Sequence, residues 1–308
     1  MAYGKRHITP HVVTMTSAPR LFDRQLLRRR IGRAASGFSA ANFLKTRSIE
    51  DILDTLSAVN RRFGTALEIG SRDGSLRRAL LENSLVSEKI DFIIETDLSD
   101  QNIGQVVLDE EALPFGDDTL DLVVSALAFH STNDLPGVLV QIRRALRPDG
   151  LLIASQFGGE TLRELRTVLM EAELEVRGGS GARIAPFAES YDCVDLLKRA
   201  GFNMPVVDTD KVVVAYAHPL NLLRDLRAMG ETNILHDRPR KGLNRAILNR
   251  AFELYAERFP HPEGGVRATF EIITLSGWTP HESQQKPLQP GSAKVRLADA
   301  LSVKEGRL

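Results

Sequence analysis

The chain has 308 residues, 43% of them hydrophobic, with 40 basic and 40 acidic side chains in balance. This length and composition indicate a globular protein of one large domain or two smaller ones. Cys193 is the only cysteine, which excludes an internal disulfide and a cysteine-rich zinc site, and no apolar run reaches the ~20 residues of a membrane-spanning helix.

The amino-terminal region carries an excess of positive charge. Residues 1–47 contain ten Lys or Arg and one acid, a net of +9, against −9 for the rest. We expect residues 1–20 to be a disordered extension or a start-codon artefact, and residues 21–64 to form a basic helical segment. Such an arm can guide a protein to RNA or a membrane surface. Because it lacks interleaved aromatic residues, a helix that docks on the acidic remainder is favoured.

Two helices are expected within this segment. The first covers residues 21–35, where apolar positions recur at helical spacing among arginines. The second is expected to begin at Ser48, because a serine followed three residues later by Asp51 resembles a capping box.

A short apolar strand is expected at residues 66–69, and it contains the acidic Glu68 just before the glycines Gly70 and Gly74. A buried carboxylate needs a partner, because its desolvation is costly. At the carboxyl end of a strand in an open α/β sheet, that partner is expected to be a cationic or hydroxyl group on a bound molecule. The glycines let the backbone approach this molecule. An ordinary turn with a solvated Glu68 is the alternative.

The loop departs from a dinucleotide-binding turn, because Arg72 replaces the second glycine and the acid precedes the first. It resembles motif I of the class I S-adenosylmethionine (SAM)-dependent methyltransferases, in which this loop lies under the amino-acid end of the cofactor. The resemblance implies SAM contacts at Glu68, Gly70, Ser71, Arg72 and Gly74. Arg72 either crowds the cofactor carboxylate or pairs with it.

Strands and helices alternate after this loop, which predicts an α/β protein with a parallel, doubly wound sheet. Further strands are expected at about 90–95, 106–108, 120–127, 151–156 and 206–216, with helices at about 76–83, 139–146, 162–172 and 188–200 and a turn at 147–150.

The alternation stops after the expected core at residues 65–218. Helices at about 220–229 and 244–259 precede a β run at 266–275. If that run is a seventh strand, residues 219–265 form a helical insertion before it, interpreted as a lid on the substrate side, and residues 266–308 form the last strand and a polar tail. The sequence therefore predicts a Rossmann-like, seven-stranded class I methyltransferase sheet.

Acidic residues recur where the next two strands end. Asp97, with Leu98 beside it, is placed to accept hydrogen bonds from two vicinal ribose hydroxyls, although Glu95 is a rival. Asp109 and Glu110 follow the third strand, where a carboxylate can accept from an adenine amino group. Taken alone, Asp109 and Glu110 would be ordinary loop acids. Because they follow Glu68 and Asp97 in the chain, a role in cofactor binding is favoured.

The fourth strand contains Ser125 and leads to His130. The carboxyl end of this strand faces the reacting group in the expected fold, so Ser125 is assigned to the cofactor site. His130 is a candidate to orient a substrate or to move a proton near neutral pH. A core histidine bonded to backbone is an equally good interpretation.

Segments spread over residues 20–300 carry a more specific pattern. They are Phe22-Asp23-Arg24, Leu113-Pro114-Phe115, residues 121–125, 133–136, 157–162, Met229-Gly230-Glu231-Thr232-Asn233 and residues 277–284. Together they resemble the methyltransferase-like assembly factors of respiratory complex I. The resemblance implies a SAM site and a protein substrate, an iron–sulfur subunit of NADH:ubiquinone oxidoreductase. It implies the mitochondrial matrix in a eukaryote and the cytoplasm in a bacterium.

The chemistry is left open. The family's mitochondrial members are implied to hydroxylate an arginine, whereas related sequences are SAM-dependent methyltransferases. The histidines show no His-x-x-x-His or facial-triad spacing, so no metal site is expected and no oxygen-activating centre can be named. A non-catalytic assembly chaperone, a Rossmann oxidoreductase and an RNA methyltransferase remain as alternatives.

Overall fold

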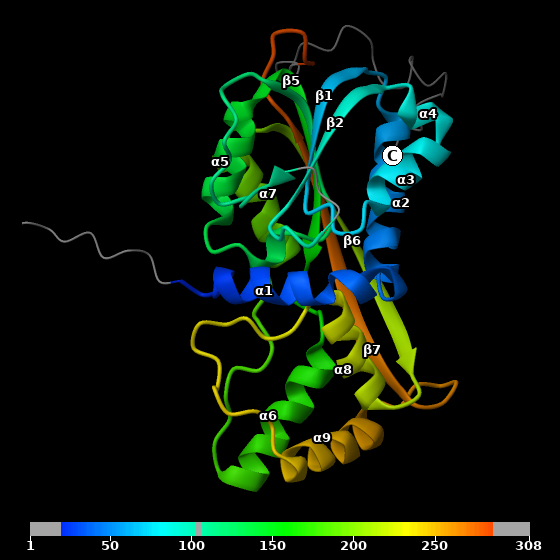
Figure 1. Ribbon diagram of the computed structural model, residues 1–308, viewed down its shortest axis with the longest axis vertical. Helices are drawn as coiled ribbons and strands as arrows, with labels where there is room; N and C mark the ends of the chain where they lie inside the picture. Colours follow the sequence, from blue (N-terminus) through cyan, green and yellow to red (C-terminus); the bar gives the residue numbers. More distant parts are fainter. Residues whose placement is uncertain (1–19, 103–105, 286–308) are drawn as a thin grey trace, which may run out of the picture.

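The computed structural model describes residues 20–102 and 106–285, whose strands form one mixed seven-stranded sheet of order β3-β2-β1-β4-β5-β7-β6 (Figure 1). The strands are β1 Phe63–Ile69, β2 Ile90–Asp97, β3 Val106–Val107, β4 Leu120–Ser125, β5 Leu146–Phe157, β6 Asn203–Tyr216 and β7 Val266–Trp278. Residues 1–19 of the extension expected at 1–20, and residues 286–308 of the expected tail, lie outside the described residues. None of the helices in the described part is long and apolar enough to cross a membrane.

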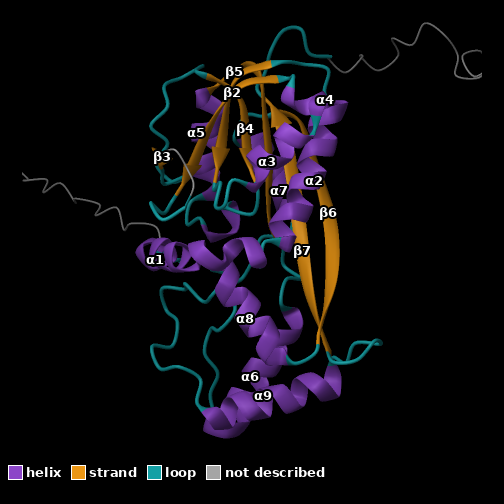
Figure 2. Cartoon of the chain, turned by 45° about the vertical axis from the view of Figure 1, so that its right-hand side comes forward, coloured by secondary structure: helices purple, strands orange, loops and turns teal. Residues whose placement is uncertain are grey.

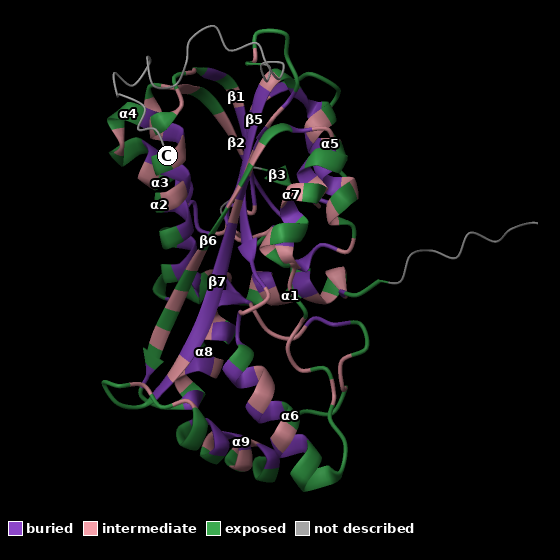
Figure 3. Ribbon diagram, turned by 180° about the vertical axis from the view of Figure 1, so that it is seen from behind, coloured by how far each residue is buried: buried purple, intermediate pink, exposed green. Residues whose placement is uncertain are grey.

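The expectation of a wholly parallel sheet is wrong at one edge. The strands from β3 to β5 run parallel, whereas β7 is antiparallel to both β5 and β6. The reason lies in the segment between β6 and β7. It returns the chain to the end of β6, where Tyr216 pairs with Val266, so β7 has to run back along β6. Figure 3 shows β7 buried along its length while β6 alternates, as an edge strand does.

Two helical layers cover the two faces of the sheet. Helices α2 Phe43–Ala58, α3 Ser75–Glu82 and α4 Ser84–Ser87 pack on one face, and α5 Leu135–Ala145 and α7 Ser190–Arg199 cover the other (Figure 1). Each layer buries its own apolar cluster. The predicted alternation of strands and helices is confirmed here, because each helix buries an apolar stripe against apolar strands.

A second helical group packs on the far halves of β6 and β7 (Figure 2). It contains α8 Pro219–Met229 and α9 Arg245–Arg258 from the expected insertion, together with α6 Arg163–Arg177. Helix α6 was expected within the core at residues 65–218. In the structure it packs with α8 and α9, because Leu165, Val168 and Leu169 belong to the same apolar cluster as residues of those two helices.

The basic segment contains α1 Arg24–Ala34 and a 3₁₀ helix, η1 Ala35–Ala40, and α1 lies across the molecule between the sheet and the second helical group (Figure 1). Asp23 caps α1 by accepting a hydrogen bond from the Leu26 amide, 2.9 Å. The basic helix therefore docks on its own domain, as favoured from the sequence.

Three expected boundaries are wrong. Helix α2 begins at Phe43, and Ser48 lies buried inside it, bonded to the hydroxyl of Ser155, because the apolar face of the helix extends upstream of the apparent cap. The fourth strand ends at Ser125. The fifth begins at Leu146 and includes the expected turn at residues 147–150.

Candidate functional site

The central cavity has a volume of about 440 Å³, including space open to solvent, and lies at the carboxyl ends of β1, β2 and β4. α1 contributes Leu27 and Ile31 to its wall. Six of the residues expected at the site line it: Gly70, Arg72, Asp97, Leu98, Glu110 and His130. The carboxyl edge of a parallel sheet is the usual ligand position in this class of fold.

The glycine loop after β1 is held against β2. The amides of Gly70 and Ser71 both donate to the Thr96 carbonyl at 2.9 Å. Gly70 has φ +80°, and a Cβ there would lie 2.8 Å from the Cβ of Ala128, so a side chain would fill the space in which the loop passes the cavity wall. Gly74 has φ +69° and precedes α3.

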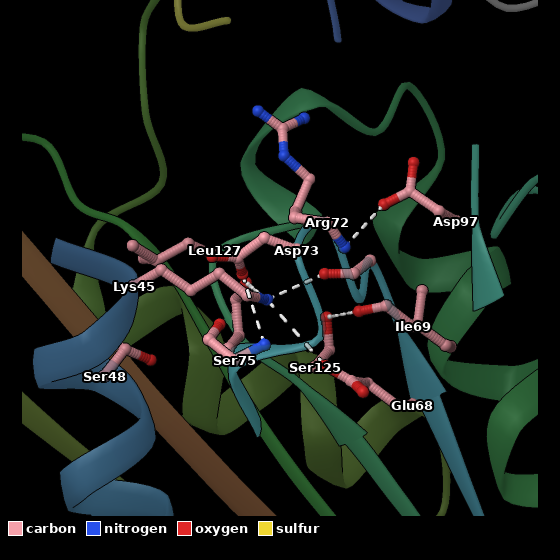
Figure 4. Close-up of polar contacts among 12 residues, drawn as sticks. Lys45, Ser48, Glu68, Ile69, Arg72, Asp73, Ser75, Asp97, Ser125 and Leu127 are labelled. Carbon is pink, nitrogen blue, oxygen red and sulfur yellow. Dashed lines mark hydrogen bonds and ion pairs between the residues drawn. The ribbon is translucent and has the colours of Figure 1, made fainter. Parts of the chain in front are cut away.

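Asp97 is held in one orientation at the end of β2 (Figure 4). Its Oδ2 accepts from the Arg72 amide at 3.0 Å, and its Oδ1 accepts from the Ser99 amide at 3.0 Å and from Asn102 Nδ2 at 2.7 Å. A carboxylate has about four acceptor positions, so Asp97 keeps capacity for a hydroxyl in the cavity. Its rival Glu95 is bonded to Arg77, 2.7 Å, and does not line the cavity.

The acidic loop after β3 has an unexpected partner in Arg24 of α1. Arg24 Nη2 lies 2.8 Å from Asp109 Oδ1 and 2.7 Å from Glu110 Oε1. Burial alone would lower the pKa of Arg24, but these two carboxylates outweigh it and raise that pKa. Only Glu110 lines the cavity, and Asp109 lies outside the lining. The adenine contact expected of Asp109 stays a prediction. Arg24 already binds the Asp109 carboxylate and would compete with an adenine amino group for it.

Glu68 is fully buried, so the alternative of a solvated carboxylate is wrong. Among the described residues neither of its oxygens has a hydrogen-bond partner, and Lys45 Nζ lies 3.9 Å from Oε1. Lys45 comes from α2 and also donates to the Gly70 carbonyl at 2.7 Å and the Ala126 carbonyl at 3.3 Å. The cation facing Glu68 is therefore a side chain of this protein, and Glu68 does not line the central cavity.

Burial raises the pKa of Glu68 to about 7 and lowers the pKa of Lys45. Between its ordinary value of 4.5 and about 7, Glu68 binds a proton in the folded state only. The folded state then holds more protons than the unfolded state, so its free energy of unfolding falls as the pH rises through this window, by up to about 3 kcal/mol.

The variant Glu68→Gln is expected to lose this pH dependence, because its amide does not titrate. Urea unfolding of the full chain at pH 5 and pH 8, without cofactor, measures the change for wild type and variant. An equal fall in both proteins would show that another group titrates in this window.

Arg72 lies between the central cavity and a second cavity of about 340 Å³. Its guanidinium donates to the Met229 carbonyl and lies over the Phe38 ring, 4.5 Å from the centroid. The backbone of Arg72 is left-handed, φ +60°, a conformation easier for the glycine usual in this loop. Lys45 lines the same second cavity, which therefore presents two cations.

His130 is 3% exposed at its side chain, and its Nε2 lies 3.0 Å from Glu231 Oε2. The ring packs on Phe157 with centroids 4.6 Å apart. The imidazole thus meets a carboxylate and not backbone, and Nδ1 has no hydrogen-bond partner among the described residues. Glu231, for which no role was predicted from the sequence, lines the central cavity beside His130.

The remaining expected residues near the glycine loop are Ser71, Gly74 and Ser125. Ser125 Oγ donates to the Ile69 carbonyl at 3.2 Å and links β4 to β1. Ser71 is fully buried. Neither serine nor Gly74 lines the central cavity, so direct cofactor contacts at these positions stay predictions. Within residues 20–102 and 106–285, no group of three or more His, Cys, Asp or Glu is arranged to hold a metal ion.

Comparison with known proteins agrees with this geometry. Residues 67–154 match the family model of a methyltransferase domain. The chain is 39% identical over 291 residues to "Arginine-hydroxylase NDUFAF5, mitochondrial" of Danio rerio, covering 91% of this chain and 89% of that protein. It is 29% identical over 286 residues to "Malonyl-[acyl-carrier protein] O-methyltransferase" of Halorhodospira halophila, covering 89% and 94%.

The solved structure of YcgJ from Bacillus subtilis superposes with a TM-score of 0.50 at 14% identity, over 76% of this chain and 99% of that one, and shares the fold. These matches confirm the class I methyltransferase fold, the SAM cofactor of such a domain and the family resemblance read from the sequence. The chain belongs to the family of the NDUFAF5 arginine hydroxylases, built on a SAM-dependent methyltransferase domain.

Proposed function

We propose that this enzyme modifies a side chain of a complex I subunit at the central cavity, with an iron–sulfur subunit as its partner. The observation that carries the proposal is the pair of adjoining cavities. The central cavity shares His130, Ser131 and Glu231 with a third cavity of about 500 Å³. A cofactor and a substrate side chain can therefore approach each other at these residues.

The residues of the central and second cavities fit SAM. Asp97 would accept a ribose hydroxyl, because its carboxylate is held in place and keeps one free acceptor position. Lys45 and Arg72 would pair with the amino-acid carboxylate in the second cavity. Gly70 leaves room for the cofactor beside Ala128. SAM, when bound, supplies an electrophilic methyl group.

His130 is the proposed acid–base residue. Its Nε2 is 3.0 Å from Glu231, and its ring borders both the cofactor cavity and the third cavity. A carboxylate at this distance fixes the orientation of the imidazole. If the acceptor is already a neutral nucleophile, the main task of the protein is to hold the reacting atoms in line.

Arginine hydroxylation is the second candidate, and the name of the 39% identical relative favours it. The same two cavities would hold SAM and the arginine, but the insertion of an oxygen atom would also need an oxidant, such as O2 with two electrons from a reductant, which SAM does not supply. We place the reaction in the matrix for a eukaryotic host and in the cytoplasm for a bacterial one.

Mass spectrometry of the complex I iron–sulfur subunits distinguishes the candidates. Cells with the protein are compared with cells that lack it and with cells that carry Asp97→Asn. A gain of about 14 Da indicates methylation and a gain of about 16 Da hydroxylation. The Asp97→Asn cells should show neither gain. Identical subunit masses in all three strains would leave only the non-catalytic chaperone.

A further inference from the structure

The third cavity has a wall of unusual composition. It adjoins the central cavity and is lined by four phenylalanines, Phe22, Phe157, Phe187 and Phe270, and by a single carboxylate, Glu231. The phenylalanines come from the amino-terminal segment, from the end of β5, from the loop after α6 and from β7. Four distant parts of the chain therefore contribute rings to one cavity, here called the slot, whose wall also has polar residues and a single carboxylate.

The aromatic rings are packed around His130. Phe157 and Phe187 lie with centroids 6.0 Å apart in an edge-on arrangement, and Phe187 lies 6.0 Å from the His130 ring. Phe157 also lies 6.2 Å from Phe270. The faces of such rings accept a flat cation through cation–π contacts, and the ring edges can contact its long apolar stem.

Glu231 is charged and accessible at the end of this slot. Its side chain is 24% exposed, in contrast to 3% for His130. Burial alone would raise the pKa of Glu231, but His130 and Arg72 outweigh it and lower that pKa. Only Oε2 is bonded, to His130, and Oε1 has no partner among the described residues.

The two guanidinium groups nearest this carboxylate donate their hydrogen bonds to other groups. Arg183 lines the cavity, but its Nε and Nη2 donate to the fully buried Glu173 at 3.0 and 2.6 Å. Arg72 donates to the Met229 carbonyl. An anionic substrate group would meet Glu231 as a like charge, whereas a cationic one would find an unpaired carboxylate oxygen.

We propose that Glu231 and the surrounding phenylalanines form the subsite that receives the guanidinium of an arginine side chain of the protein substrate, with Glu231 as the residue that selects it. This inference rests on the proposed function for the identity of the reaction. The inference goes beyond the proposed function by naming the groups that recognise the acceptor side chain. The planar guanidinium matches the slot and donates to carboxylates more specifically than a lysine ammonium does.

Peptide binding tests the subsite. The probes are acetyl-Gly-Arg-Gly amide and the same peptide with citrulline, which has the shape of arginine without its charge. Calorimetry with the full chain, with and without S-adenosylhomocysteine, should show arginine bound at least about tenfold more tightly than citrulline. Glu231→Gln should reduce this ratio to about one, because the charge-assisted hydrogen bond is lost. The control Asp237→Asn, at an exposed carboxylate of the same loop, should leave the ratio unchanged.

Equal affinities for the two peptides in the wild type, or no measurable binding of either at millimolar concentration, would overturn the proposal. An undiminished ratio in Glu231→Gln would exclude Glu231 as the selecting residue. If that variant does not fold, Glu231→Ala, which also removes the charge, serves in its place, and a ratio equal to wild type then counts against Glu231. A mass gain without peptide discrimination would reject this subsite alone, whereas discrimination without any mass gain would reject the proposed reaction alone.

Discussion

Replacing Asp97 with asparagine is expected to weaken SAM binding by about tenfold to a hundredfold. The variant keeps the size of the side chain but loses the charge that makes hydrogen bonds to hydroxyls strong, worth about 1.5–3 kcal/mol. Because Asp97 also accepts from the Arg72 amide and Asn102, a small shift of the loop adds to the loss. Isothermal calorimetry with the full chain measures the affinity.

Asp100→Asn is the matched control, because Asp100 is exposed three residues further along the same loop. It should bind SAM as the wild type does. Thermal unfolding without cofactor checks that both variants keep the fold. A folded Asp97→Asn protein with unchanged affinity would show that the ribose does not lie at the end of β2.

Replacing Arg24 with methionine is expected to lower the free energy of unfolding by about 3–5 kcal/mol. Arg24 is 12% exposed at its side chain, and the Glu110 carboxylate it binds is 6% exposed. Without the guanidinium, Glu110 would be a buried charge with no cationic partner, which is the costly case for a buried ion pair. Arg24 also donates to the Ser131 carbonyl at 3.1 Å, so α1 would lose its tie to the loop after β4.

Urea unfolding of the full chain measures this effect. Arg28→Met, at an exposed position of the same helix, should change stability by about 0.5 kcal/mol or less. The double variant Arg24→Met with Glu110→Gln should recover part of the loss, because it removes both charges. An Arg24→Met protein as stable as wild type would mean that the ion pair contributes nothing net and that apolar contacts alone hold α1.

The Arg24 pair also affects how the cofactor site is filled. Asp109 and Glu110 were expected to face the adenine, but they hold an arginine from α1. The side chains of Leu27 and Ile31 on that helix line the same cavity. The amino-terminal helix is therefore part of the wall of the central cavity, which its basic composition did not indicate.

The sequence alone determined the class of fold, and it picked out six residues that the structure brings together around one cavity. Alternating apolar runs and amphipathic helices are local patterns, so the strands could be found from residue spacing. The glycine loop at residues 70–74 and Asp97 are local as well, because strand ends and turns leave a signature within a few residues.

Only the tertiary structure decided which side chains meet at the site. Lys45 faces Glu68, Arg24 binds Asp109 across 85 positions, and Glu231 binds His130 across 101. Spacing in the sequence carries no information about such pairs, because their geometry depends on how separate elements pack. The direction of β7 could not be predicted for the same reason, because an apolar strand has the same pattern whichever way it runs. Its direction is set by the segment with α8 and α9, which returns the chain to the end of β6.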